Sequence, residues 1–205
     1  GVSTLWRVGL DGRADMLDLG PYRALSQLAV SSQGKLALLA SGMVTPTRLI
    51  VIEDGKIRVA ARSDSEVIPE EFLPVPRALD WRAADGALVH GIYYPPSNPD
   101  FSAEGLPPAI LNIHGGPTSA VSLRYNADAS YFTSRGYAYL EVNYRGSTGY
   151  GRSYMNALRQ RWGDIDVEDT VSGCAALGEQ GLADSSRLVI KGGSAGGYTV
   201  LNSLV

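Results

Sequence analysis

The sequence contains only one cysteine, Cys174, so no disulfide can form within the chain. No histidine follows Cys174, and it lies among apolar residues of a predicted helix, so we expect a small core residue rather than a nucleophile. A single unpaired thiol fits a reducing compartment such as the cytoplasm. The first residue is Gly1 rather than methionine, so the lack of a signal peptide says nothing about secretion.

Other absences restrict the partners and cofactors. The 18 basic residues do not cluster and are outnumbered by 21 acidic ones, so nucleic acid is not an expected partner. No apolar run approaches the roughly 18 residues needed to cross a bilayer, so no contact with a membrane is expected. With two histidines and no metal-ligand spacing, the sequence predicts neither a metal nor any other cofactor.

The first third of the chain reads as short strands separated by turns. Strands are predicted at residues 4–8, 25–30, 36–40, 49–52 and 57–60, and Asp11-Gly12 is typical of a hairpin turn. Their regular spacing favours a sandwich or the blades of a propeller, with about one and a half four-stranded units present. A polar, proline-containing linker follows at residues 69–76.

The remainder alternates between strand and helix patterns. A hairpin is predicted at residues 78–82 and 88–94, followed by strands at 109–113, 137–142 and 188–191. Helices are predicted near residues 121–134, over 164–177 and directly after Ser194. This order is that of an α/β fold, and it matches the first five strands of an α/β-hydrolase sheet.

Ser194 is the candidate nucleophile. It lies at the centre of the pattern G-x-S-x-G, after a predicted strand and before a predicted helix, which is typical of a nucleophile elbow. In a chain with 24 glycines the pattern alone arises by chance in roughly one case in four, so the strand–helix context carries the assignment. The α/β-hydrolase order is serine, acid, histidine, and no residue after Ser194 can fill the last two roles. We therefore expect the 205-residue chain alone to be inactive.

A second motif, His-Gly-Gly-Pro at residues 114–117, follows the strand 109–113. In α/β-hydrolases one oxyanion-hole N–H comes from this loop and the other from the residue after the nucleophile. The predicted donors are the backbone N–H groups of Gly116 and Ala195. His114 precedes the serine, opposite to the hydrolase order, so it is expected to hold the loop rather than act as the base. His90, within a predicted strand, is expected to be structural.

The glycine-rich segment at residues 143–151 lacks the register of a nucleotide-binding loop. It contains Arg145, which either binds a substrate carboxylate or carbonyl or forms a structural ion pair, and the ion pair is the favoured alternative. Tyr198 joins His114 and Arg145 as a candidate for substrate binding or loop support.

Together these motifs resemble the prolyl oligopeptidase family of serine peptidases, in particular its acylaminoacyl-peptidase and dipeptidyl-peptidase-like branch. The resemblance covers residues 110–200, through the strings at 114–117, 143–151, 162–164, 168–169 and 192–198. It implies that residues 1–68 are the C-terminal blades of a β-propeller and residues 77–205 the N-terminal half of the catalytic domain. It also implies short peptides as substrates, because the propeller restricts access. In some branches a tyrosine occupies the position of His114, which leaves the cleavage preference open.

Two alternatives remain at this point. One is a carboxylesterase or lipase, against which the propeller-like strands and Pro117 argue. The other is an inactive fragment that acts only as a folding or binding unit. In either case the strand at residues 188–191 is expected to have an open edge with unpaired backbone groups. We expect a partner to pair with this edge, either the remainder of the same enzyme or a second copy of the chain.

Overall fold

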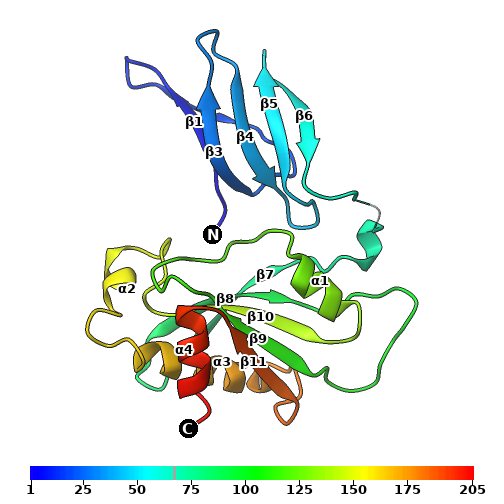
Figure 1. The fold of residues 1–205 in the computed structure, drawn as a ribbon, viewed down its shortest axis with the longest axis vertical. Coiled ribbons are helices and arrows are strands. Elements are labelled where there is room, and N and C mark those ends of the chain that lie inside the picture. Colours follow the sequence, from blue (N-terminus) through cyan, green and yellow to red (C-terminus); the bar gives the residue numbers. More distant parts are fainter. Residues whose placement is uncertain (67) are drawn as a thin grey trace. The chain divides into compact units, whose positions relative to one another are not determined.

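The computed structural model describes residues 1–66 and 68–205 (Figure 1). The chain divides into two compact units. The first comprises Gly1–Glu70 together with Ser122–Asn126, and the second comprises Glu71–Val121 together with Ala127–Val205. The described residues include no helix that is both long and apolar enough to cross a bilayer.

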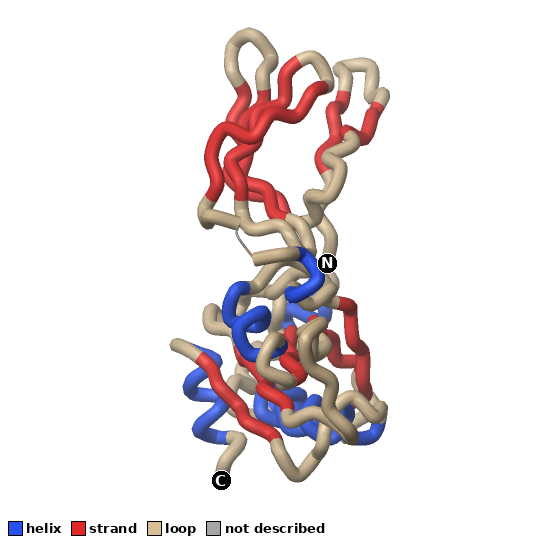
Figure 2. Tube along the Cα trace, turned by 90° about the vertical axis from the view of Figure 1, so that its right-hand side faces the viewer, coloured by secondary structure: helices blue, strands red, loops and turns tan. Residues whose placement is uncertain are grey.

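The first unit is built from antiparallel strands. A four-stranded sheet runs in the order β3 (Ala24–Val30), β4 (Leu36–Ser41), β5 (Arg48–Glu53) and β6 (Lys56–Arg62), and β1 (Leu5–Val8) pairs with β2 (Ala14–Leu17). Alternate residues of β5 are buried, as the two-residue period of a strand requires. Leu38, Ile50 and Tyr22 belong to the small core of this unit. Figure 2 shows these strands in red.

The second unit contains a mixed sheet in the order β11-β9-β10-β8-β7. Its strands are β7 (Arg77–Arg82), β8 (Leu88–Tyr94), β9 (Ala109–Ile113), β10 (Ala138–Asn143) and β11 (Leu188–Gly192). β9 pairs in parallel with both β10 and β11, whereas β8 is antiparallel to β7 and β10. The carboxyl ends of the three parallel strands therefore lie on the same side of the sheet, and the loops that follow these strands meet there.

Helices cover both faces of this sheet. Leu140 of β10 packs in the core with residues of α3 (Ile165–Glu179), whereas the hydroxyl of the adjacent Tyr139 bonds Asp128 of α1 (Ala127–Thr133). Neighbouring residues of a strand point to opposite faces, so α1 and α3 lie on opposite sides. A 3₁₀ helix at Glu70–Phe72, the short α2 (Arg152–Asn156) and α4 (Ala195–Asn202) complete the elements.

The structure corrects one expected element. The helix predicted near residues 121–134 begins only at Ala127. Residues 122–126 join the first unit instead, where the Tyr125 N–H donates to the carbonyl of Gly42 at 2.6 Å. A long-range backbone hydrogen bond thus replaces the expected first helical turn. Elsewhere the observed strands agree with the predicted ranges to within two residues, and β2 and α2 were not predicted.

Candidate active site

Ser194 lies in the short turn between a strand and a helix. β11 ends at Gly192 and α4 begins at Ala195, which leaves the Ser194 side chain exposed at the turn. Its backbone has φ 54° and ψ −123°, a conformation that residues other than glycine rarely adopt. Such a conformation costs about 1–3 kcal/mol, and it clusters at functional sites. The strand–turn–helix context that the sequence predicted is therefore present, with Ser194 in a strained backbone.

Glycines on either side of Ser194 let α4 approach the sheet closely. A Cβ atom on Gly196 would clash with the carbonyl of Ile113, the last residue of β9. One on Gly192 would lie 2.6 Å from the backbone of Gly196. The glycines of the serine motif are thus required by packing, and they set the start of α4 against the end of β9.

The His-Gly-Gly-Pro loop lies against the same turn. A Cβ atom on Gly115 would be 3.0 Å from the carbonyl oxygen of Gly193 and 3.2 Å from the Cβ of Ser194. Gly116 has φ 138°, outside the range that other residues favour. On the other side of Ser194, Ala195 opens α4, where the first N–H groups have no partner within the helix and the helix dipole favours negative charge. The structure therefore brings the loop and the first turn of α4 together around Ser194.

His114 makes two hydrogen bonds that fix its ring. Nδ1 lies 2.8 Å from the carbonyl oxygen of Gly115, and Nε2 lies 2.8 Å from Oγ of Ser147. Burial lowers the pKa of His114 and so favours the neutral ring. A carbonyl can only accept, so Nδ1 carries the proton and Nε2 accepts from the hydroxyl of Ser147. The Gly115 carbonyl and the Gly116 N–H belong to one planar peptide group and point in opposite directions. By holding the carbonyl, His114 sets the direction of the Gly116 N–H.

Tyr144, which the sequence analysis did not single out, packs against this loop and forms hydrogen bonds with it. Its ring is buried and stacks on His114 with the ring centres 4.5 Å apart. Its hydroxyl lies 3.1 Å from the carbonyl oxygen of His114 and 2.9 Å from that of Pro117. One phenol thus contacts both ends of the four-residue loop. Burial also raises the pKa of Tyr144, which keeps the hydroxyl protonated and able to donate.

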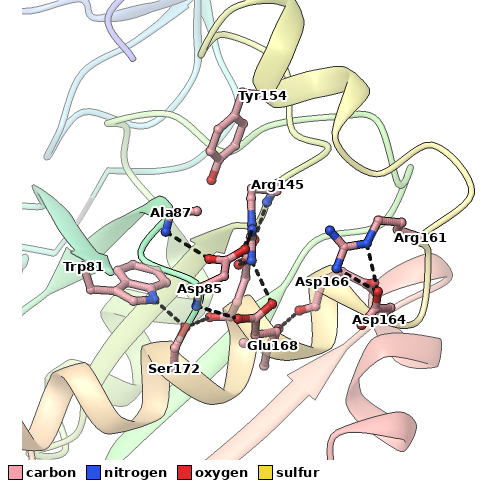
Figure 3. Close-up of polar contacts among 12 residues, drawn as sticks. Trp81, Asp85, Ala87, Arg145, Tyr154, Arg161, Asp164, Asp166, Glu168 and Ser172 are labelled. Carbon is pink, nitrogen blue, oxygen red and sulfur yellow. Dashed lines mark hydrogen bonds and ion pairs between the residues drawn. The ribbon is translucent and has the colours of Figure 1, made fainter. Parts of the chain in front are cut away.

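Arg145 is buried and surrounded by carboxylates of the chain itself (Figure 3). Its guanidinium binds Asp169 at 2.7 Å, Asp85 at 2.5 Å and Glu168 at 3.1 Å, and its backbone N–H donates to Asp169 at 2.6 Å. A hydrogen bond from the backbone of Ala87, followed by the one from Arg145, lowers the pKa of Asp85, whereas burial raises the pKa of Asp169. The cluster joins the β7–β8 turn, α3 and the loop after β10.

A second buried carboxylate ties α4 to α3. Asp166 accepts the backbone N–H of Gly163 at 2.7 Å and the hydroxyl of Thr199 at 2.5 Å. Tyr198 of α4 lies beside this turn, with its ring centre 5.0 Å from that of Trp162. A Cβ atom on Gly163 would lie 2.9 Å from the Tyr198 ring. The segment of residues 162–164 thus packs against α4, the helix that follows Ser194.

His90 lies within β8 rather than in the loops around Ser194. Its Nδ1 is 2.7 Å from Asp80, and its ring stacks on Tyr150 with centres 4.2 Å apart. Neither His90 nor His114 forms a hydrogen bond with Ser194 in the described part of the chain. Residues 195–205 contain no histidine, aspartate or glutamate. The described residues therefore hold a candidate nucleophile and two candidate oxyanion donors, and neither histidine is placed to act as the base.

Comparison with known proteins shows which sequences this chain resembles. Residues 123–205 match the model of the prolyl oligopeptidase family. The dipeptidyl aminopeptidase BIII of Pseudoxanthomonas mexicana is 29% identical over 173 residues, 84% of this chain and 22% of that protein. The acylamino-acid-releasing enzyme of Arabidopsis thaliana is 40% identical over 91 residues, 44% of this chain and 12% of that protein.

Solved structures resemble the whole chain. A puromycin-hydrolyzing peptidase of Mycobacterium tuberculosis superposes with a TM-score of 0.92 at 36% identity, covering 98% of this chain and 32% of that one. A puromycin hydrolase mutant crystallised in complex with PGG gives 0.92 at 37% identity, covering 100% and 32%. The chain thus spans about a third of these solved chains and about a fifth or less of the two curated relatives.

Proposed function

Because the chain belongs to the prolyl oligopeptidase family, we propose that it supplies the nucleophile and the oxyanion hole of a serine peptidase that cleaves short peptides. Ser194 Oγ attacks the scissile carbonyl and forms an acyl-enzyme. The backbone N–H groups of Gly116 and Ala195 donate to the oxygen that becomes negative. A histidine from elsewhere in the enzyme takes the serine proton and passes it to the leaving amine, and an acid orients that histidine.

The close approach of Gly115 to Ser194 is the observation that carries this proposal, since a Cβ atom at Gly115 would lie 3.2 Å from the Cβ of Ser194. The loop that follows β9 therefore lies against the turn that follows β11, which supports assigning one oxyanion donor to each of these segments. Removing one oxyanion donor typically costs about 3–4 kcal/mol of transition-state stabilisation. If His114 no longer oriented the Gly116 N–H, kcat would therefore fall substantially.

We also propose which domain of the enzyme each of the two units belongs to. The antiparallel sheet β3–β6 has the form of a propeller blade, which supports assigning residues 1–68 to the end of a β-propeller. The mixed sheet β7–β11 with helices on both faces supports assigning residues 77–205, after a linker at 69–76, to the first half of an α/β-hydrolase domain. A propeller that restricts access to the catalytic domain would admit peptides and exclude folded proteins.

The test uses the full-length enzyme that carries this chain. Ser194→Ala should abolish hydrolysis of aminoacyl-anilides and labelling by a fluorophosphonate, while the melting temperature changes little because the turn accepts alanine. Ser102→Ala, at an exposed serine of the 95–108 loop, is the matched control and should keep both activities. Retention of more than a small fraction of kcat in Ser194→Ala would refute the assignment. Faster turnover of p-nitrophenyl esters than of any peptide substrate would favour an esterase.

A further inference from the structure

A shallow cavity of about 300 Å³ lies beside the proposed oxyanion hole. One wall consists of Pro117 and Thr118, and the other comes from the segment that begins with α2. The residues that this segment contributes are Met155, Asn156, Leu158, Arg159 and Trp162.

Covalent and packing contacts connect this cavity to the reacting atoms. Pro117 follows Gly116, one proposed oxyanion donor, directly in the chain. Trp162 contacts Tyr198, which lies one helical turn after Ser194 in α4. The cavity therefore adjoins the loop that carries Gly116, and its Trp162 packs on α4, the helix that begins at the other proposed donor, Ala195. A group bound there would lie close to the proposed oxyanion hole.

The walls are mainly apolar, and one cation lies at the rim. The indole of Trp162 is 50% exposed although Met155 and Leu158 lie nearby, so a large aromatic surface faces solvent at this position. Trp and Met favour contact with aromatic and aliphatic groups. Arg159 is exposed, and its guanidinium has no carboxylate partner among the described residues. Its uncompensated positive charge disfavours a basic group beside it.

We propose that this cavity is a substrate subsite for a large apolar or aromatic side chain next to the scissile bond. Trp162 provides its main contact surface, and Arg159 selects against lysine and arginine. The inference rests on the proposed function, because it places the subsite relative to Ser194 as the nucleophile.

The experiment measures kcat/KM in the full-length enzyme with two sets of substrates. One set of aminoacyl-anilides varies the acyl residue among Gly, Phe and Lys. The other set of peptides keeps the acyl residue fixed and varies the leaving residue in the same way. In one of the two sets, Trp162→Ala should lower the Phe-to-Gly ratio of kcat/KM by about tenfold or more, and Trp162→Phe should restore most of it. In that same set, Arg159→Gln should raise the Lys-to-Gly ratio several-fold.

Two control variants separate this effect from general damage. Trp6→Ala removes an indole of matched exposure, 52%, from the first unit and should leave both ratios unchanged. Arg161→Gln removes a neighbouring guanidinium that pairs with Asp164 at 2.9 Å and does not line the cavity (Figure 3). It should leave the Lys-to-Gly ratio unchanged.

The outcomes distinguish the subsite from the proposed function. If Trp162→Ala destabilises the fold, Met155→Ala replaces it, because this variant removes another wall of the cavity and should also lower the Phe-to-Gly ratio in one of the two sets. Unchanged Phe-to-Gly ratios in both substrate sets, with hydrolysis and serine labelling intact, would overturn the subsite and leave the proposed function standing. An unsubstituted enzyme that hydrolyses neither set would overturn both.

Discussion

The hydroxyl of Tyr144, the residue after β10, lies within hydrogen-bond distance of two carbonyl groups of the His-Gly-Gly-Pro loop, those of His114 and Pro117. Tyr144→Phe keeps the ring that stacks on His114 but removes the one proton that the hydroxyl offers to these two carbonyls. The Pro117 carbonyl still accepts from the N–H of Ser119 at 3.1 Å, so it is the His114 carbonyl that loses its donor. Leaving a buried acceptor unpaired costs about 1–3 kcal/mol. Because the freed loop carries the Gly116 N–H, we expect kcat of the full-length enzyme to fall about tenfold or more, with KM and the far-UV spectrum unchanged. Tyr131→Phe, at an exposed tyrosine, is the control. A wild-type kcat in Tyr144→Phe would show that the loop is held without the hydroxyl.

His114 gives a pH-dependent prediction at the same scale. Burial lowers its pKa in the folded protein, and this outweighs the opposite effect of the hydrogen bond to Gly115. The His114 side chain therefore binds a proton at a higher pH in the unfolded chain than in the folded one. Its contribution to stability is complete above about pH 6.5 and is lost progressively as the pH falls below that value. Melting temperatures at about pH 7.5 and 5.5 should differ less for His114→Gln than for the unsubstituted protein. An equal difference in both proteins would contradict this role for His114.

At the scale of elements, the Arg145 cluster joins α3 to the β7–β8 turn and to the loop after β10. Asp169→Asn removes the charge that pairs with the buried guanidinium, which typically destabilises a fold by about 3–5 kcal/mol. Asp164→Asn breaks an exposed pair with Arg161, worth about 1 kcal/mol or less. Urea unfolding of the two variants should show this contrast. Similar losses in both would mean that the remaining carboxylates, Asp85 and Glu168, suffice for Arg145.

The elements differ in how far the sequence predicts them. The strands at residues 109–113 and 188–192 follow from continuous apolar runs, which signal buried strands without any long-range information. The short β2 and α2 have too few residues for a periodic pattern. The start of α1 depends on a hydrogen bond between Tyr125 and Gly42, some 80 residues apart in the sequence, which no local pattern reports. The contacts of Tyr144 and Asp166 with the candidate site are long-range in the same way, whereas the position of Ser194 between strand and helix is encoded locally.

At the scale of the whole molecule, β11 forms one edge of the mixed sheet in the described residues. Val189 of this strand and Leu201 of α4 are largely exposed apolar side chains. An apolar strand with an open edge pairs readily with other chains. We therefore expect the 205-residue polypeptide alone to self-associate or to need a complementary piece of the enzyme, as sedimentation would measure. A stable, cooperatively folding monomer would contradict this expectation.

The same polypeptide alone is expected to be catalytically silent. Neither of its histidines is bonded to Ser194, so the hydroxyl lacks a base to activate it. Incubation with a fluorophosphonate should label Ser194 no faster than Ser194→Ala reacts at other positions. Rapid stoichiometric labelling would show that the serine is activated within this chain.

The segment Ser122–Asn126 belongs to the first unit, while the residues on both sides of it belong to the second. The polypeptide therefore passes from one unit to the other three times, at residues 70–71, 121–122 and 126–127. In genetic terms the two units are not modules that one crossover could exchange. A hybrid gene joined anywhere in residues 69–76 would combine a first unit from one parent with a 122–126 segment from the other. The backbone bond between Tyr125 and Gly42 would then depend on both parents, so compatible hybrids should be those that inherit the five-residue segment together with the first unit.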